Sequence, residues 1–171
     1  MATYTFKISL TGDGAVGKTS WVHRLCTGKF KNRHIPTLGV EVHSVNYRCT
    51  DGTSVEFDIW DCAGTDKYVG LGEGYYIGSD GAIIMCDLTN GDSCATSASW
   101  YHDIKRICSD IPVVVSGNKC ESPDTYINMQ TGERRGINFC NTSVAANKNV
   151  HLPLLILARK LRRDDSFEFV I

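Results

Sequence analysis

The chain has 171 residues, of which 42% are hydrophobic, and its formal net charge is -1 at pH 7. This length and composition allow one substantial hydrophobic core, so we expect a single domain over residues 1–171. The charge lacks the basic excess that marks direct DNA or RNA binding, and the longest apolar run, 152–158, is far too short to cross a bilayer. We therefore expect neither a nucleic-acid partner nor a membrane partner.

The N-terminus and the cysteines argue against a secreted protein. Met1-Ala2-Thr3-Tyr4 has no charged region followed by an apolar one, and position 2 is not glycine, so neither secretion nor myristoylation is indicated. The last residues, Phe169-Val170-Ile171, include no cysteine for prenylation. Eight cysteines occur without a C-x-x-C pair, so we expect reduced, mostly buried thiols rather than disulfides or a zinc site.

The first predicted strand, Phe6–Leu10, leads directly into a glycine-rich motif. Residues 12–19 fit G-x-x-x-x-G-K-[ST] at every defined position, and Trp21–Cys26 can continue as a helix. In such a turn, backbone N–H groups converge on phosphate oxygens at the positive end of the helix. We expect Lys18 to reach the β- and γ-phosphates and Thr19 to bind Mg²⁺, the alternative being an accidental match. The expected nucleotide contacts are Asp13, Gly14, Ala15, Val16, Gly17, Lys18, Thr19 and Ser20.

A polar, basic loop follows this helix, and two strands come next. Residues 27–37 end in Pro-Thr and are typical of a surface loop. Apolar residues mostly alternate over 40–47 and again over 55–60, with Asp51-Gly52 between them, which predicts two antiparallel strands joined by a hairpin. The second strand leads into Asp61-Cys62-Ala63-Gly64, a D-x-x-G sequence at a strand end.

Strands and helices alternate in the second half of the chain. Glycines at 64, 70, 72, 74 and 78 predict a mobile segment with at most a short helix. The apolar runs 82–87 and 112–117 are typical of buried parallel strands, and the second opens onto Asn118-Lys119-Cys120-Glu121. We expect helices over 93–109 and 152–163, a strand over 137–142, and at most a short helix in the polar stretch 122–136.

This alternation implies a mostly parallel sheet covered by helices on both faces, with ligands at the carboxyl ends of the strands. We predict a six-stranded, three-layer α/β domain. No repeat, linker or low-complexity segment divides it. On its own, a phosphate loop leaves kinases and ATPases open as alternatives.

Four motifs occur in the order and approximate separations of a small GTPase: the phosphate loop, Thr37, Asp61–Gly64 and Asn118-Lys119. Within the Ras superfamily the sequence most resembles the Ran subfamily, the nuclear-transport GTPases, and the resemblance spans nearly the whole chain. It implies a P-loop NTPase fold, a small G domain, that binds GTP or GDP with Mg²⁺. The stretches that carry the resemblance are Thr37–His43, Trp60-Asp61, Gly74–Ile77, Ala82–Met85, Gly117–Lys119 and Leu157–Leu161.

The resemblance also implies a role for each motif residue. Thr37 would bind Mg²⁺ and touch the γ-phosphate, Asp61 would hold Mg²⁺ through water, and the Gly64 amide would bond the γ-phosphate. Loss of that phosphate would release both loops. Asn118 would bond the purine edge, and the Lys119 stem would lie along the base. The alternatives are a loop threonine beside a proline and, for Asn118 and Lys119, a plain strand-end turn.

Three motif positions depart from the family pattern. Thr65 stands where the family places the glutamine that orients the attacking water, so we expect slow GTP hydrolysis. Glu121 replaces the aspartate that accepts the guanine N1 and N2 protons, and the base-supporting turn is Ser143-Val144-Ala145, without the family's lysine. We expect weaker binding and faster exchange, with guanine still preferred over adenine. The catalytic groups are then Lys18, Thr37, Gly64 and Thr65.

The resemblance implies partners and a location as well. Expected partners are nuclear transport receptors of the importin and exportin type, with a Ran-type exchange factor and activating protein, in the nucleus and cytoplasm. Lys67 and Tyr68 match positions that the family presents to its import factor, the alternative being a solvated pair in a loop. The family's basic receptor-binding patch is reduced to Arg134-Arg135. Ran continues into an acidic tail that favours GDP, and this restraint is absent if the sequence is the full protein. With the glutamine also missing, we expect a protein that stays loaded with GTP. We also expect a monomer.

Two other functions stay open. A degenerate GTPase with a structural nucleotide could occupy Ran's receptors as a binding module, and the fold could also persist without nucleotide, although intact Lys18 and Thr19 disfavour that version. Analysis of the nucleotide released from the purified protein tests whether the fold persists without nucleotide. Phosphate release over hours distinguishes the switch from the module. The altered motifs favour a divergent extra copy over a cell's principal Ran.

Overall fold

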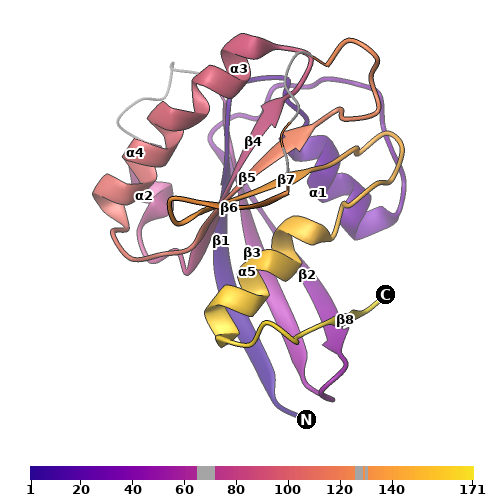
Figure 1. Ribbon diagram of the computed structural model, residues 1–171, viewed down its shortest axis with the longest axis vertical. Coiled ribbons are helices and arrows are strands. Elements are labelled where there is room, and N and C mark those ends of the chain that lie inside the picture. The colour runs from indigo at the N-terminus through magenta and orange to yellow at the C-terminus, as the bar shows by residue number, and fades with distance from the viewer. Residues whose placement is uncertain (65–71, 126–128, 130) are drawn as a thin grey trace.

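The computed structural model describes residues 1–64, 72–125, 129 and 131–171. Within them the central feature is an eight-stranded sheet in the order β6-β7-β5-β4-β1-β3-β2-β8 (Figure 1). The strands are β1 (Thr3–Thr11), β2 (Val40–Cys49), β3 (Ser54–Cys62), β4 (Gly81–Asp87), β5 (Val113–Asn118), β6 (Gly132–Arg134), β7 (Ile137–Asn141) and β8 (Phe169–Val170). The helices are α1 (Lys18–Thr27), α2 (Glu73–Tyr76), α3 (Gly91–Ala95), α4 (Ser97–Ile107) and α5 (Leu152–Arg162).

Most neighbouring strands run parallel, because crossover connections return the chain to the same end of the sheet. β1 is parallel to both of its neighbours, β3 and β4, and β5 and β7 continue the parallel series. The β2–β3 hairpin is antiparallel, as the turn signal at Asp51-Gly52 predicts. β6 pairs antiparallel with β7, and β8 pairs antiparallel with β2, at the two ends of the sheet. The α/β class and the mostly parallel sheet are therefore confirmed.

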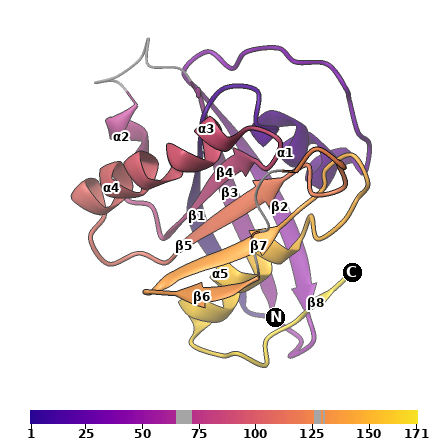
Figure 2. The same cartoon turned by 45° about the horizontal axis from the view of Figure 1, so that its top comes forward.

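Helices cover both faces of the sheet and give three layers (Figure 2). On one face, Trp21 of α1 and Leu154 of α5 belong to a buried cluster with Met85 of β4. On the other face, Ile104 of α4 packs in a second cluster with Ile84 of β4. Every residue of β4 is buried, which accounts for its continuous apolar run.

Two short strands lie beyond the six that the sequence predicts. β6 has three residues, all exposed, and β8 has two, so neither offers an alternation of apolar and polar residues that a pattern could detect. The prediction of six strands is wrong by these two. β8 pairs with the end of β2 and shields part of an edge that would otherwise present unpaired backbone groups.

The single helix predicted over 93–109 is two helices, α3 and α4. α3 begins before residue 93 because the Asn90 side chain accepts hydrogen bonds from the backbone N–H groups of Asp92 and Ser93 and caps the helix. Thr96 separates α3 from α4 but keeps helical backbone angles, with φ −68° and ψ −14°. The helical periodicity therefore runs through the interruption and does not reveal it.

The remaining elements follow the predicted ranges. β7 and α5 correspond to the strand over 137–142 and the helix over 152–163. In the glycine-rich segment, the short helix α2 lies at Glu73–Tyr76, while 65–71 fall outside the described residues. All eight cysteines are free thiols, and four of them are buried. Among the helices that the structure describes, none has the length and apolar character needed to span a membrane.

Candidate nucleotide-binding site

The predicted motif residues gather at one end of the sheet. The loop 12–17 follows β1, Asp61 and Gly64 lie at the end of β3, Asn118 ends β5, and the turn 143–145 follows β7. Because these strands are parallel, their carboxyl ends meet at the same edge (Figures 1 and 2). We call the loop 12–17 the phosphate loop from here on.

Two glycines are required by the shape of the phosphate loop. At Gly12, with φ +139°, a Cβ would lie 2.1 Å from the carbonyl oxygen of Met85. At Gly17, with φ +108°, a Cβ would lie 2.3 Å from Nδ2 of Asn118. Ala15 has a left-handed φ of 62°, which residues with a Cβ rarely adopt. The loop is therefore wound tightly against the ends of β4 and β5.

Lys18, the first residue of α1, points back into the phosphate loop. Its Nζ donates hydrogen bonds to the carbonyl oxygens of Gly12 and Asp13, each at 2.8 Å. Only 6% of the residue is exposed, and burial lowers the pKa of Lys18 to about 8, although the Asp61 charge opposes this shift. A buried ammonium group gains most from a nearby anion, so its position suits the predicted contact with phosphate.

Three oxygen-bearing side chains converge next to Lys18. Thr19 Oγ1 donates to Asp61 Oδ2 at 2.6 Å and lies 2.9 Å from Thr37 Oγ1. Asp61 is fully buried, and its Oδ1 has no hydrogen-bond partner among the described residues. Burial raises the pKa of Asp61. An unpartnered carboxylate oxygen beside two hydroxyl groups fits a hard cation that takes oxygen ligands, so these residues fit Mg²⁺.

Gly64 brings the end of β3 against the phosphate loop. A Cβ at this position would lie 2.6 Å from the Gly14 nitrogen and 2.6 Å from Lys18 Nζ. Only a residue without a side chain allows this approach. The Gly64 backbone therefore lies next to the lysine that is predicted to contact the γ-phosphate, which suits the role implied for its amide.

A cavity of about 280 Å³ opens beside the phosphate loop. Its walls include Gly64 and the predicted phosphate-loop contacts except Asp13 and Val16. The segment between α1 and β2 also lines this cavity and contributes Lys31, Arg33 and Thr37. Cationic side chains around one cavity suit a polyphosphate ligand.

Asn118 joins the phosphate loop to the turn after β7. Its Nδ2 donates to the Val16 carbonyl oxygen at 3.0 Å, and its Oδ1 accepts from the Val144 N–H at 3.1 Å. These three residues are each at most 3% exposed. An amide nitrogen carries two hydrogens, so one N–H is left for a ligand. The side chain can hold the loop and still bond a purine edge.

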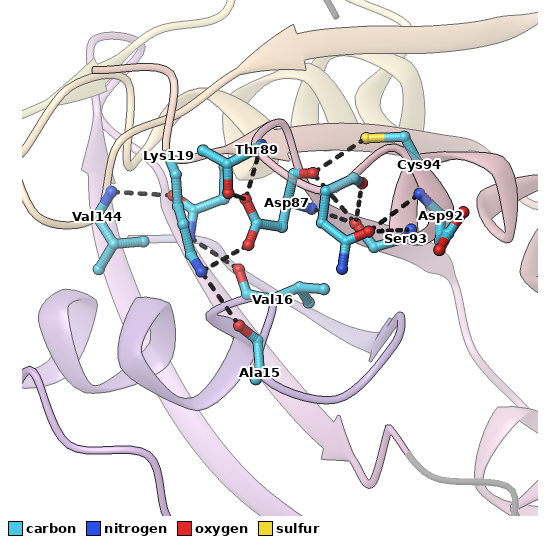
Figure 3. A network of polar contacts seen from close by, with 11 residues as sticks. Ala15, Val16, Asp87, Thr89, Asp92, Ser93, Cys94, Lys119 and Val144 are labelled. Atoms are coloured by element: carbon cyan, nitrogen blue, oxygen red, sulfur yellow. Dashed lines mark hydrogen bonds and ion pairs between the residues drawn. The ribbon is translucent and has the colours of Figure 1, made fainter. Parts of the chain in front are cut away.

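Lys119 extends from the end of β5 to the phosphate loop (Figure 3). Its Nζ pairs with Asp87 Oδ2 at 2.6 Å and donates to the Ala15 carbonyl oxygen at 3.4 Å. Asp87 Oδ1 also accepts from the Thr89 N–H and hydroxyl. Burial opposes ionisation of Asp87, but hydrogen bonds from Lys119 and Thr89 lower its pKa overall. The Lys119 stem is thus held extended across the part of the site that the resemblance assigns to the nucleotide base. We call this part, formed by 118–121 and 143–145, the base side.

The remaining base-side residues differ in how firmly they are held. Ser143 is fully buried, and its Oγ accepts from the Ala146 N–H at 2.9 Å. Ala145 is exposed. Glu121 is exposed as well, and its side chain makes no hydrogen bond with the described residues. The turn 143–145 is therefore rigid on its inner side, whereas Glu121 projects toward solvent.

Three residues with predicted roles, Thr65, Lys67 and Tyr68, lie outside the described residues. Conversely, sequence reasoning missed the residues that hold Asp13 and Lys119 in place. Asp13 bonds to Thr96 and Trp100, 83 and 87 residues away, and Asp87 lies 32 residues before Lys119. No local pattern marks contacts over such separations, although Asp87, as the last residue of an apolar strand, could have been flagged.

A glycine-rich loop between a parallel strand and a helix, with a buried lysine and converging oxygen ligands, defines a P-loop nucleotide-binding domain. The sequence model of the Ras family matches residues 7–163. The chain belongs to the Ras family of small GTPases. Members of this family are P-loop GTPases that act as switches between a GTP-bound and a GDP-bound state and generally bind Mg²⁺ with the nucleotide.

Proposed function

We propose that this small GTPase is a Ran-like switch with slow GTP hydrolysis that acts in, or interferes with, transport between nucleus and cytoplasm. The main support is the segment Thr37–His43, which resembles the corresponding segment of Ran. It begins at Thr37, hydrogen-bonded to Thr19, and continues into β2. Leu38 and Val42 within it are 76% and 49% exposed, so a receptor could contact them.

Slow hydrolysis is proposed because of Thr65. In GTP hydrolysis a water oxygen attacks the γ-phosphorus, the bond to the β–γ bridging oxygen breaks, and inorganic phosphate leaves. The family glutamine orients that water, whereas a threonine hydroxyl is shorter and has no amide. Intrinsic rates in the superfamily are already about 10⁻⁴ s⁻¹, so the larger deficit is expected in turnover stimulated by an activating protein.

A single-turnover assay with GTP, with and without a Ran-type activating protein, tests this proposal. We expect little stimulation of the natural chain and at least about 100-fold stimulation after Thr65→Gln. Thr50→Gln, at an exposed threonine of the β2–β3 turn, is the matched control and should behave like the natural chain. Strong stimulation of the natural chain would refute slow hydrolysis.

The proposed partners are transport receptors of the importin and exportin type, together with a Ran-type exchange factor, for a monomer found in nucleus and cytoplasm. Arg134 and Arg135 are exposed beside β7, consistent with a small basic patch. A pull-down of receptors by the GTP-loaded and GDP-loaded protein tests this part. Retention of importin-type receptors by the GTP-loaded form alone is expected, and retention of none would contradict it.

The second candidate is a binding module whose nucleotide is structural. The altered positions Thr65 and Glu121 favour this candidate. Thr65 lacks the amide that orients the attacking water, and the exposed Glu121 side chain projects into solvent and not toward Asn118 and Lys119. Phosphate release measured over hours separates the two. A switch hydrolyses its bound GTP and releases phosphate in that time. A module keeps its nucleotide intact and stays bound to its receptors.

A further inference from the structure

The Asp13 side chain, inside the phosphate loop, is held by the far side of the fold. Thr96 Oγ1 donates to Asp13 Oδ2 at 2.7 Å, and Trp100 Nε1 donates to Asp13 Oδ1 at 2.8 Å. Both carboxylate oxygens are therefore engaged by residues at the junction of α3 and α4. Asp13 does not line the cavity. Its carboxylate therefore differs in role from the residues that face the cavity and can contact a ligand there.

The two donors are themselves firmly placed. Thr96 Oγ1 also lies 3.0 Å from the Ser93 carbonyl oxygen, one turn earlier in the helical segment. Ser93 Oγ is bonded to the backbone N–H and carbonyl oxygen of Asp87 at the end of β4. Trp100 packs against the second buried cluster, which includes Ile84 of β4 and Ile104 of α4. Asp13 is thus attached to an element that is anchored to the central strand of the sheet.

These contacts belong to a network of hydrogen bonds that leaves the phosphate loop at Asp13 and returns to it at Ala15. From Ser93 the network passes to Asp87 and then to Lys119, which donates to the Ala15 carbonyl oxygen (Figure 3). The phosphate loop is therefore tied at Asp13 through α3 and α4, and at Ala15 through β5. Gly14 lies between the two ties and faces the cavity.

A loop that must present its N–H groups to phosphate binds best when its shape is held before the ligand arrives. The strained left-handed angle at Ala15, φ 62°, persists only if neighbouring contacts maintain it. We infer that Thr96 and Trp100 are positioning residues that hold the phosphate loop in its nucleotide-binding shape through Asp13 and so slow the release of bound nucleotide. This inference rests on nucleotide binding by the proposed switch and does not depend on its transport role.

Release of a fluorescent GDP analogue from the chain of residues 1–171 with Mg²⁺ tests the inference. Thr96→Val removes the hydroxyl and keeps the side-chain shape, and Trp100→Phe removes the indole N–H and keeps an aromatic ring. Each should speed release about tenfold, the usual effect of losing a hydrogen bond to a charged group. Thr96→Ser, which keeps a hydroxyl, is the matched control and should release the GDP analogue at the natural rate.

A double-mutant comparison separates positioning from a general loss of stability. If Trp100 acts through Asp13, then Trp100→Phe should have little further effect on release once Asp13 is changed to Ala. Tyr101→Phe, on the same helix, is the matched control, because the Tyr101 hydroxyl has no hydrogen bond among the described residues. It should leave the release rate unchanged.

Release from Thr96→Val and Trp100→Phe at the natural rate would overturn the inference, as would additive effects of Trp100→Phe and Asp13→Ala. If Trp100→Phe does not fold, the Thr96→Val and Thr96→Ser pair decides alone. A natural chain that retains no guanine nucleotide after purification would contradict the proposed switch itself, which is a result distinct from either outcome above.

Discussion

Asn118→Ala should destabilise the domain even when no nucleotide is bound. The Asn118 side chain is the partner of the Val16 carbonyl oxygen and of the Val144 N–H, at 3.0 and 3.1 Å. Val16 and Val144 are 1% and 2% exposed, so water cannot easily replace either bond. A buried polar group without a partner costs about 1–3 kcal/mol, and the two together about 2–6 kcal/mol, a large part of the roughly 5–15 kcal/mol that stabilises a typical domain.

Thermal unfolding in EDTA, after removal of nucleotide, measures this effect. For a chain of this size each kcal/mol lowers the melting temperature by about 2–4 °C, so a loss near 10 °C is expected. Asn46→Ala, at an exposed asparagine of β2, is the control and should change the free energy of unfolding by less than about 0.5 kcal/mol. If Asn118→Ala melts together with this control, the two bonds add nothing and the argument from burial is wrong.

Three further predictions concern the phosphate side of the site. Gly17→Ala should cost at least about 1–3 kcal/mol of stability, because φ is +108° and the new Cβ would lie 2.3 Å from Asn118 Nδ2; a natural melting temperature with nucleotide retained would contradict this. Phosphate binding needs a protonated Lys18, and its pKa of about 8 lies below the ordinary value of 10.5. Nucleotide affinity should therefore fall as pH rises, by about fourfold from pH 7 to 8.5 in a titration, whereas Lys18→Met, which also controls for ionisation of the nucleotide, should lack this component. Chelation of Mg²⁺ should speed nucleotide release at least about tenfold in the natural chain and much less in Asp61→Asn, because the unpartnered Asp61 oxygen is proposed to hold the metal through water; equal acceleration of both proteins would refute that role.

Much of the site could be predicted from the sequence because parallel strands bring their carboxyl ends together. The phosphate loop, Asp61 and Asn118 each come directly after or at the end of an apolar strand, so their convergence follows from the topology alone. The glycines could be predicted as well, since Gly12 and Gly17 occupy positions where any Cβ would meet backbone or a buried side chain. What the motif describes is largely the shape of the backbone.

The remainder depends on contacts that no local pattern encodes. Trp100 looks like an ordinary apolar position in a helical repeat, yet its indole N–H reaches Asp13. β6 and β8 could not be predicted, because strands of three and two residues have no periodicity to read. The break at Thr96 could not be predicted either, because its backbone angles remain helical and the helical periodicity continues through it.

The two sides of the site are held with very different strength, and this difference indicates where a switch can move. On the base side, Asn118 bridges residues that are almost fully buried. On the other side, the phosphate loop is tied at Asp13 and Ala15, but the segment between α1 and β2 is not: residues 30–36 are exposed, and Thr37 is joined to α1 by a hydroxyl contact with Thr19 at 2.9 Å. One such bond is worth about 1 kcal/mol, a bias of only about fivefold between attached and detached forms of the segment. Ligand contacts worth a few kcal/mol more at Thr37 would therefore decide the population of the attached form, whereas the same contacts would leave the base side unchanged.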